Sequence, residues 1–134
     1  MFFHVSDSGG RISSKPSTGV PDFDRSVAFE LWIRSDDIDD SHVLLESGWA
    51  TQGLSLTIGD ADGSGQSDDL RFRVVGTSGN SITSTVDIDQ FASPTDDFIH
   101  IAAVYNDSND NRYAEIYING ALYGRTEGLL GPEN

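Results

Sequence analysis

Apolar and polar side chains alternate with a period of two along most of the chain, the pattern of half-buried β-strands. The clearest case is Val27 to Arg34, in which one parity holds Val, Phe, Leu and Ile and the other holds Ala, Glu, Trp and Arg. Similar strands are predicted over residues 42–47, 53–59, 69–76, 82–88, 98–105, 113–118 and 121–125. No segment shows a convincing helical period.

Turn signals separate these strands. Asp60 to Asp68 is a Gly/Asp/Ser loop, and Asn106 to Asn111 is a polar hairpin loop. Asn119-Gly120 is the dipeptide favoured in a tight type I′ hairpin. Eight short strands divided by such turns predict an all-β fold, an antiparallel sandwich or barrel.

The apolar parity of the middle and late strands predicts the core. Its members are Leu54, Leu56, Ile58, Leu70, Phe72, Val74, Ile82, Val86, Ile88, Ala114, Ile116 and Ile118.

The length of 134 residues fits one domain. The net charge of -14, with 22 acidic against 8 basic residues, would repel a polyanion such as nucleic acid, so this partner class is set aside. No stretch approaches the roughly 20 apolar residues of a membrane span, and the first residues lack a secretory signal. The absence of cysteine excludes a disulfide framework.

Several motifs together resemble a known family. Residues 29–34, 44–48 and 53–56 resemble the opening strands of laminin-G-like, concanavalin A-like jelly-roll domains. Phe98 to Tyr105 is similar to their aromatic-x-His-x-Ala-x-x-Tyr strand, and Ile116 to Gly120 matches their Tyr-x-Asn-Gly hairpin. Their order along the chain makes the resemblance more specific than any one motif. It implies an antiparallel jelly-roll sandwich.

The resemblance also suggests how the chain is divided. Residues 1–19 are expected to be an irregular lead-in or the end of a first strand, and residues 20–134 the jelly-roll domain. The family normally continues past the Asn-Gly hairpin into further strands, so the domain is expected to lack its last strands and to leave an open sheet edge.

The loop after residue 59 is a candidate calcium site. Asp60, Asp62, Ser64 and Asp68 place oxygen side chains at positions 1, 3, 5 and 9 of the calcium-loop pattern, with a glycine at the turn position. Aspartate also outnumbers glutamate 17 to 5. Arg71 stands where the bidentate glutamate belongs, which excludes an EF-hand. The alternative is a solvated acidic hairpin loop, or a general acidic bias of the kind found at high salt.

Ligand-binding side chains are sought on the parity opposite the core. Trp32, Arg71, Arg73, Tyr113 and Tyr117 are expected to line one sheet face, because aromatic rings beside charged groups are suited to sugars. Burial of the aromatic residues under loops or further strands is the competing interpretation.

Catalytic motifs of known type are missing from the sequence. The paired-carboxylate strand motif of related glycoside hydrolases is absent, as are a nucleophile elbow and a zinc spacing of the histidines. Asp87 and Asp89 share a parity near a strand end and are interpreted as a solvent-facing pair.

We therefore expect a non-catalytic binding or adhesion module of an extracellular or cell-surface multidomain protein. It is expected to recognise carbohydrate or an extracellular protein, with a structural Ca²⁺ as candidate cofactor. The alternatives are the remnant of a glycoside hydrolase or lyase with the same sandwich, or a structural spacer without a ligand site.

Overall fold

The structure is a computed structural model, and it describes residues 26–34, 41–49, 52–60, 63–65, 68–76, 79–91, 98–108 and 111–128. The predicted lead-in over residues 1–19 and the last six residues of the chain lie outside these ranges. The predictions about the lead-in and about missing final strands therefore remain predictions.

Eight strands and one short 3₁₀ helix form the described part of the chain. The strands are β1 (Val27–Arg34), β2 (His42–Trp49), β3 (Gln52–Gly59), β4 (Asp69–Val75), β5 (Ser81–Asp87), β6 (Phe98–Ser108), β7 (Asn111–Ile118) and β8 (Ala121–Glu127), and the helix is η1 (Asp89–Phe91). All eight predicted strands are confirmed, with ends that differ by at most three residues. The helix was not predicted from the sequence.

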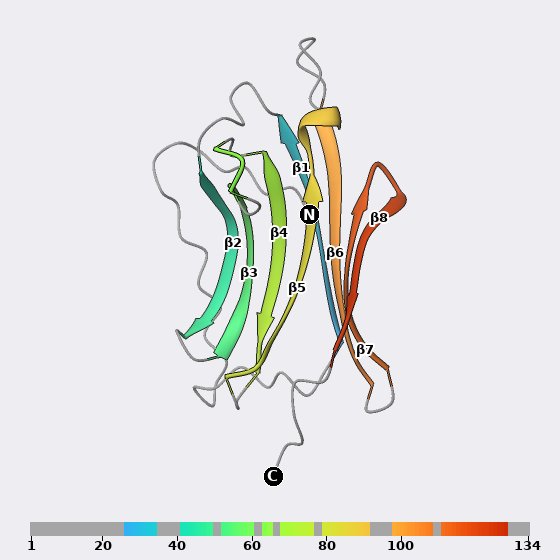
Figure 1. Ribbon diagram of the computed structural model, residues 1–134. Coiled ribbons are helices and arrows are strands. Elements are labelled where there is room, and N and C mark those ends of the chain that lie inside the picture. Colours follow the sequence, from blue (N-terminus) through green and yellow to red (C-terminus); the bar gives the residue numbers. More distant parts are fainter. Residues whose placement is uncertain are drawn as a thin grey trace.

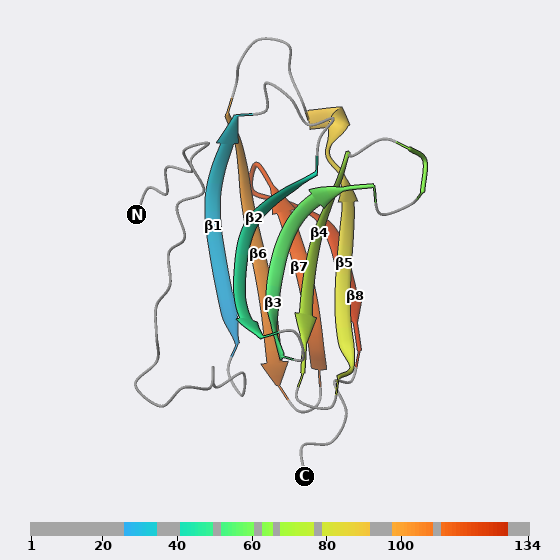
Figure 2. The same ribbon diagram turned by 90° about the vertical axis from the view of Figure 1, so that its left-hand side faces the viewer.

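The strands form two four-stranded antiparallel sheets, stacked face to face. Sheet A has the order β1-β6-β7-β8, and sheet B has the order β2-β3-β4-β5. Figure 1 shows the two layers from the side, and Figure 2 looks onto sheet B with sheet A behind it. The predicted antiparallel β-sandwich is confirmed, and the barrel alternative is not what forms.

The core fills the space between the sheets, as period-two alternation requires. Every core residue predicted in the middle and late strands is buried, and residues of β6 complete the set: Ile99, Ile101, Ala103 and Tyr105. The apolar residues of β1 are only partly buried. We attribute this to the position of β1 at the edge of sheet A, where it has one strand neighbour.

Close contact between the sheets depends on a glycine in β8. A Cβ atom on Gly124 would lie 2.7 Å from Ser84 Oγ and 2.8 Å from Val86 Cγ2, both in β5 of the opposite sheet. These distances are too short for non-bonded atoms. Any side chain at residue 124 would therefore push β8 away from β5 and open the core.

Turn geometry follows the sequence at the hairpin between β7 and β8. Asn119 and Gly120 both have positive φ, at 50° and 84°, which confirms the type I′ turn. The hairpin between β6 and β7 is tighter than predicted. The ladder continues to the pair Ser108 and Asn111, and Asn106 Nδ2 donates to the Asn111 carbonyl at 3.2 Å.

Among the described residues, no helix has the length and apolar character needed to cross a membrane.

Candidate ligand-binding face and carboxylate cluster

The outer face of sheet B is concave and polar. Figure 1 shows β2, β3 and β4 bowed toward sheet A, so the outer side of sheet B is the concave side of the curved sheet. The central part of β3, β4 and β5 points small hydroxyl side chains and two arginines outward: Ser55, Thr57, Arg71, Arg73, Thr83 and Thr85. We call this surface the concave face.

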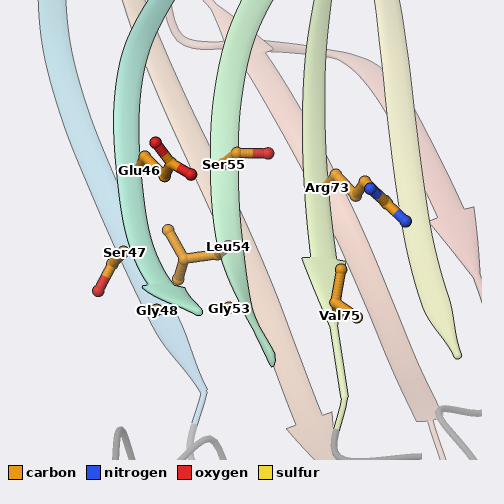
Figure 3. Close-up of a pocket in the computed structure, with 8 residues that line it drawn as sticks. All are labelled: Glu46, Ser47, Gly48, Gly53, Leu54, Ser55, Arg73 and Val75. Carbon is orange, nitrogen blue, oxygen red and sulfur yellow. The ribbon is translucent and has the colours of Figure 1, made fainter. Parts of the chain in front are cut away.

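A depression of about 170 Å³ lies at one end of the concave face. Glu46 of β2, Ser55 of β3 and Arg73 of β4 line it, together with glycines of the β2–β3 ladder (Figure 3). The base of the depression is formed by backbone at Gly53, where a Cβ atom would collide with the Ser47 carbonyl oxygen. The backbone of these two strands therefore forms part of the surface that a ligand would touch.

Arg71 and Arg73 occupy the middle of the concave face. Arg71 is half-buried and Arg73 is exposed, and neither has an ion pair or side-chain hydrogen bond within the described part of the chain. The Nε atom of Arg71 is buried without an acceptor. Figure 3 shows Arg73 extending from β4 toward β5.

The outer face of sheet A carries a different set of side chains. Trp32 is 56% exposed, and its ring lies 4.7 Å from that of His100, to which it is tilted by 45°. His100 Nε2 lies 3.7 Å from a Glu30 carboxylate oxygen. The backbone N–H and C=O groups of His100 are both hydrogen-bonded to Asn119, and its side chain is only 20% exposed.

Farther along sheet A, Glu115 is the centre of a compact polar network. Although it points outward, Glu115 is only 4% exposed. It accepts hydrogen bonds from Tyr117 Oη at 2.8 Å and from Arg125 Nη1. The Arg125 guanidinium also binds Glu127 at 2.9 Å and lies 4.1 Å above the centre of the Tyr113 ring.

The hydrogen bonds of this network shift two pKa values. The bond to Glu115 raises the pKa of the Tyr117 hydroxyl above its ordinary value, and partial burial adds to the shift. The bond to Glu127 is the main cause of the raised pKa of Arg125. Both groups are therefore held in the protonated form that the network needs.

The expectation that the five predicted ligand-binding residues share one sheet face is wrong. Trp32, Tyr113 and Tyr117 lie on sheet A, and Arg71 and Arg73 lie on sheet B. Outward residues of the two sheets of a sandwich point in opposite directions, so the two groups lie on opposite sides of the molecule. Whether any of the five binds a ligand remains a prediction.

The residues predicted to bind calcium are only partly brought together. Asp60 accepts hydrogen bonds from the backbone N–H groups of Gly63 and Gly65, at 2.7 and 3.0 Å, and so closes its own loop. Ser64 is exposed and already has an interaction partner. Asp62 lies outside the described residues.

Asp68, the fourth predicted ligand, belongs to a separate group of carboxylates. One oxygen each from Asp68, Asp87 and Asp89 lies within 4.8 Å of the other two. The Ile88 N–H donates to the Asp68 carbonyl at 2.8 Å, and the Asp89 N–H donates to Asp87 Oδ1 at 3.1 Å. These bonds fix the end of β5 beside the start of β4. We call the three residues the carboxylate cluster.

The carboxylate cluster is electrostatically strained. Partial desolvation raises the pKa of the Asp68 carboxyl, and the negative charges of Asp87, Asp69 and Asp89 raise it further, against a backbone hydrogen bond that lowers it. Three carboxylates this close repel one another, and a bound divalent cation would remove the repulsion. Oxygen ligands of this type fit a hard cation such as Ca²⁺.

Sequence reasoning missed both the cluster and most of the concave face. Asp87 is brought to Asp68 by the antiparallel register of β4 and β5, in which Asp69 pairs with Asp87. The shared parity of Asp87 and Asp89 indicated that these two carboxylates lie close together. The sequence alone does not show that Asp68 joins them, because it does not say which strands are neighbours.

Comparison with known proteins identifies the family. The family described as the concanavalin A-like lectin/glucanases superfamily, in its laminin G-like branch, matches residues 7–133. The chain belongs to this superfamily. The match begins earlier than residue 20, where the jelly-roll domain was predicted to start.

One solved structure supports the same fold for this laminin G-like domain. It is the crystal structure of the botulinum neurotoxin serotype D binding domain, at 17% sequence identity and a TM-score of 0.53. The alignment covers 76% of this chain but only 24% of the other, so this chain spans about a quarter of that protein's length. No curated protein matches the sequence.

Proposed function

We propose that this laminin G-like domain is a non-catalytic module that binds carbohydrate on its concave face, as part of an extracellular or cell-surface protein. The observation that carries the proposal is the shape of the concave face together with the side chains that it exposes. It holds a depression with a backbone floor, and its arginines and hydroxyl groups have no interaction partner among the described residues. Groups held in place but left without partners are what a ligand site needs.

The comparisons support the proposal at the level of fold. The superfamily name includes lectins, and the neighbouring structure is titled a binding domain. Fold alone does not fix the ligand. The chemistry of the face favours carbohydrate over a protein partner, because most of the outward side chains of β3, β4 and β5 carry hydroxyl or guanidinium groups. Protein interfaces instead use apolar anchors at their centre.

The superfamily name also includes glucanases, so hydrolysis is the rival function. A glycosidase needs two carboxylates that flank the scissile bond. On the described part of the concave face the acids are split, with Glu46 at the depression and the carboxylate cluster at the opposite end of β4. This separation supports a binding role. Release of reducing ends from a polysaccharide panel by the wild-type chain would contradict it.

A glycan array with the wild-type chain tests the binding function directly. We expect retention of at least one class of polysaccharide or oligosaccharide. We also expect the variant Ser55→Trp, which fills the depression, to lose this retention while its thermal unfolding stays cooperative. Trp32→Ala is the matched control on the opposite face. If the control alone loses the ligand, the site is on sheet A.

We further propose that the carboxylate cluster binds a structural Ca²⁺ ion. The mutual distances below 4.8 Å and the raised pKa of Asp68 support this. The ion would link the start of β4 to the end of β5, at the rim of the concave face. Ca²⁺ takes six or more oxygens, so three carboxylates would form only part of its shell.

A further inference from the structure

β1 is an edge strand whose backbone is paired on one side only. Among the described strands its single neighbour is β6, and in Figure 2 it is the outermost strand of sheet A. An edge strand presents a row of unpaired backbone N–H and C=O groups, on which a strand of another chain can pair. Its inward side chains pack against the core but are only partly buried: Val27, Phe29, Leu31 and Ile33. The described part of the chain therefore leaves both the backbone and the apolar side of β1 incompletely covered.

The hydrogen bonds of His100 show which residues of β1 face the outer edge. Its C=O accepts from the Asn119 N–H at 2.8 Å, and its N–H donates to Asn119 Oδ1 at 3.0 Å, both on the β7 side of β6. His100 and Trp32, its register partner in β1, are therefore a non-hydrogen-bonded pair. Such pairs alternate with hydrogen-bonded pairs along an antiparallel ladder. The N–H and C=O groups of every second residue of β1 thus point away from β6: Ala28, Glu30, Trp32 and Arg34.

The other edge strands of the sandwich are less suited to pairing. β2 and β8 each hold an extra residue that breaks the register, Leu44 and Tyr123, and such bulges disrupt an edge. β5 lies against β8, where Ser84 closely approaches Gly124 of the opposite sheet. β1 instead pairs with β6 without a break over all 8 of its residues. Of the described edges, β1 is the one that is both regular and not covered by the other sheet.

The side chains along the outer edge of β1 are complementary to a second copy of themselves. Glu30, Trp32 and Arg34 are all exposed. If two β1 strands pair antiparallel about Trp32, each Glu30 lies opposite Arg34 of the second copy, and the two tryptophans meet at the centre. Opposite charges and aromatic rings in such cross-strand positions stabilise a strand pair. A register centred on Glu30 would instead oppose two carboxylates, and one centred on Leu31 would leave both charges without a counter-charge.

We infer that two copies of this chain associate antiparallel along β1, with Trp32 at the two-fold axis and Glu30 paired with Arg34 across it. The same residues of both copies make the contact, as two-fold symmetry requires. Sheet A of one copy then continues into sheet A of the other. Because the two-fold axis is perpendicular to the sheet, the concave faces of both copies point to the same side. The association itself does not depend on the proposed carbohydrate binding.

The dimer is expected to be weak. This register aligns only residues 30–34 of each strand, and small interfaces belong to transient associations. The net charge of -14 on each copy also opposes association, although β1 itself is balanced, with one acidic and one basic residue. We expect a Kd of about 10 to 100 µM. At about 1 µM the chain is then mostly monomeric, and glycan binding or unfolding measured there reports on the single domain.

Sedimentation equilibrium of the wild-type chain from about 1 µM to about 1 mM, in about 0.15 M NaCl, tests the association. We expect a reversible equilibrium between monomer and dimer. Glu30→Arg and Arg34→Glu should each weaken it at least about tenfold, because each places like charges opposite each other. Glu30→Arg moves the net charge from -14 to -12, so general repulsion alone would make this variant associate more tightly.

An equimolar mixture of these two variants is the decisive measurement. A Glu30→Arg copy that faces an Arg34→Glu copy has opposite charges at both contacts, so the mixture should form a heterodimer with about the wild-type Kd. Within one strand residues 30 and 34 are about 13 Å apart, too far for an ion pair inside a copy. Rescue in the mixture therefore reports a contact between copies. Cooperative thermal unfolding of each variant alone checks that both are folded.

Three outcomes would overturn the inference. A wild type that stays monomeric up to about 1 mM does not pair along β1. A dimer that both variants leave unchanged has its contact elsewhere. A dimer that both variants weaken, and that their mixture does not restore, is not built on the antiparallel register about Trp32. Glycan binding at about 1 µM tests the carbohydrate proposal separately, so each of the two proposals can fail without the other.

Discussion

The two outer faces of the sandwich carry the same kinds of residue and use them in opposite ways. On sheet A, Glu115, Arg125 and Tyr117 bind one another, and the charge of Glu115 is shielded although it points away from the core. On sheet B, Arg71 and Arg73 have no such partners in the described part of the chain. We call the outer face of sheet A, whose polar side chains bind one another, the closed face. The concave face of sheet B is called the open face.

The cause of the difference lies in the cross-strand neighbours. Glu115 pairs in register with Arg125, so opposite charges meet directly on adjacent strands. Arg71 and Arg73 meet only threonine and serine on both sides. The composition of a face therefore does not say whether it is available to a ligand. The register of its strands does.

The largest expected effect of a single substitution is on the closed face. Glu115→Ala should lower the free energy of unfolding by about 2 kcal/mol, because Arg125 and Tyr117 lose their shared acceptor. This expected loss of unfolding free energy is smaller than for a fully buried ion pair, because the Arg125 side chain is 35% exposed. Urea unfolding monitored by tryptophan fluorescence measures it.

Glu30→Ala is the matched control for this prediction. Glu30 lies on the same outer face, but its side chain is 73% exposed and the nearest basic group, His100 Nε2, is 3.7 Å away. Its replacement should change stability by no more than about 0.5 kcal/mol. Equal losses in the two variants would mean that the Glu115 network does not close the face.

Calcium should stabilise the unsubstituted chain. At a concentration about 100 times its Kd, the ion should add about 2.7 kcal/mol and raise the Tm, and a chelator should reverse this. Asp87→Asn and Asp89→Asn should remove the response. If Asp60→Asn removes it and Asp87→Asn does not, the ion is bound by the loop that the sequence predicted. A wild type without any response would rule out the calcium proposal.

The pH dependence of this effect has a definite sign. The folded-state pKa of Asp68 is raised, so its ionised form is less favourable in the folded than in the unfolded protein. Without calcium, stability contributed by this group is therefore present below the unfolded pKa of about 3.9 and lost as the pH rises through the folded value. Thermal unfolding in chelator at several pH values, with Asp68→Asn as reference, measures the contribution.

The strands and the core could be predicted from the sequence because they depend on local pattern. Alternation over Leu54 to Ile58 fixes which side chains face inward, whichever strand lies beside them. Asn119-Gly120 fixes its turn, since both residues accept a positive φ. The resemblance to laminin-G-like domains then gave the sandwich.

The binding faces could not be predicted in the same way. Parity shows that Trp32 and Arg71 both point away from the core, but it does not show that β1 and β4 belong to different sheets. Placing both on one surface was therefore wrong. The meeting of Asp68 with Asp87 likewise depends on a register between strands, and local spacing favoured the nearer Asp60 and Asp62.

A smaller loss of stability is expected when the hydroxyl group of Tyr117 is removed from the closed face. Tyr117→Phe should cost about 1 kcal/mol, because it removes one hydrogen bond to Glu115. The raised pKa of Tyr117 means that this stability is fully present below pH 10 or so and is lost as the pH rises through the folded value. The difference between wild type and variant should therefore shrink in strongly alkaline buffer.

Tyr113→Phe is the matched control for the hydroxyl group. The Tyr113 ring lies under Arg125, and phenylalanine keeps a ring in that place. Its stability should stay within about 0.5 kcal/mol of wild type and should show no additional alkaline loss. If Tyr113→Phe is as damaging as Tyr117→Phe, the contribution comes from ring packing and not from the hydrogen bond to Glu115.

The smallest effect is expected on the open face, where it is also the most informative. Arg71→Met should change the free energy of unfolding by no more than about 0.5 kcal/mol, because it breaks no ion pair and removes a buried donor that lacks an acceptor. Arg125→Met, the same substitution on the closed face, should cost about 2 kcal/mol, since it leaves Glu115 buried without its cation. A large loss in Arg71→Met would mean that the fold needs this arginine. A negligible loss would mean that the fold does not need Arg71, as the proposed ligand-binding face requires.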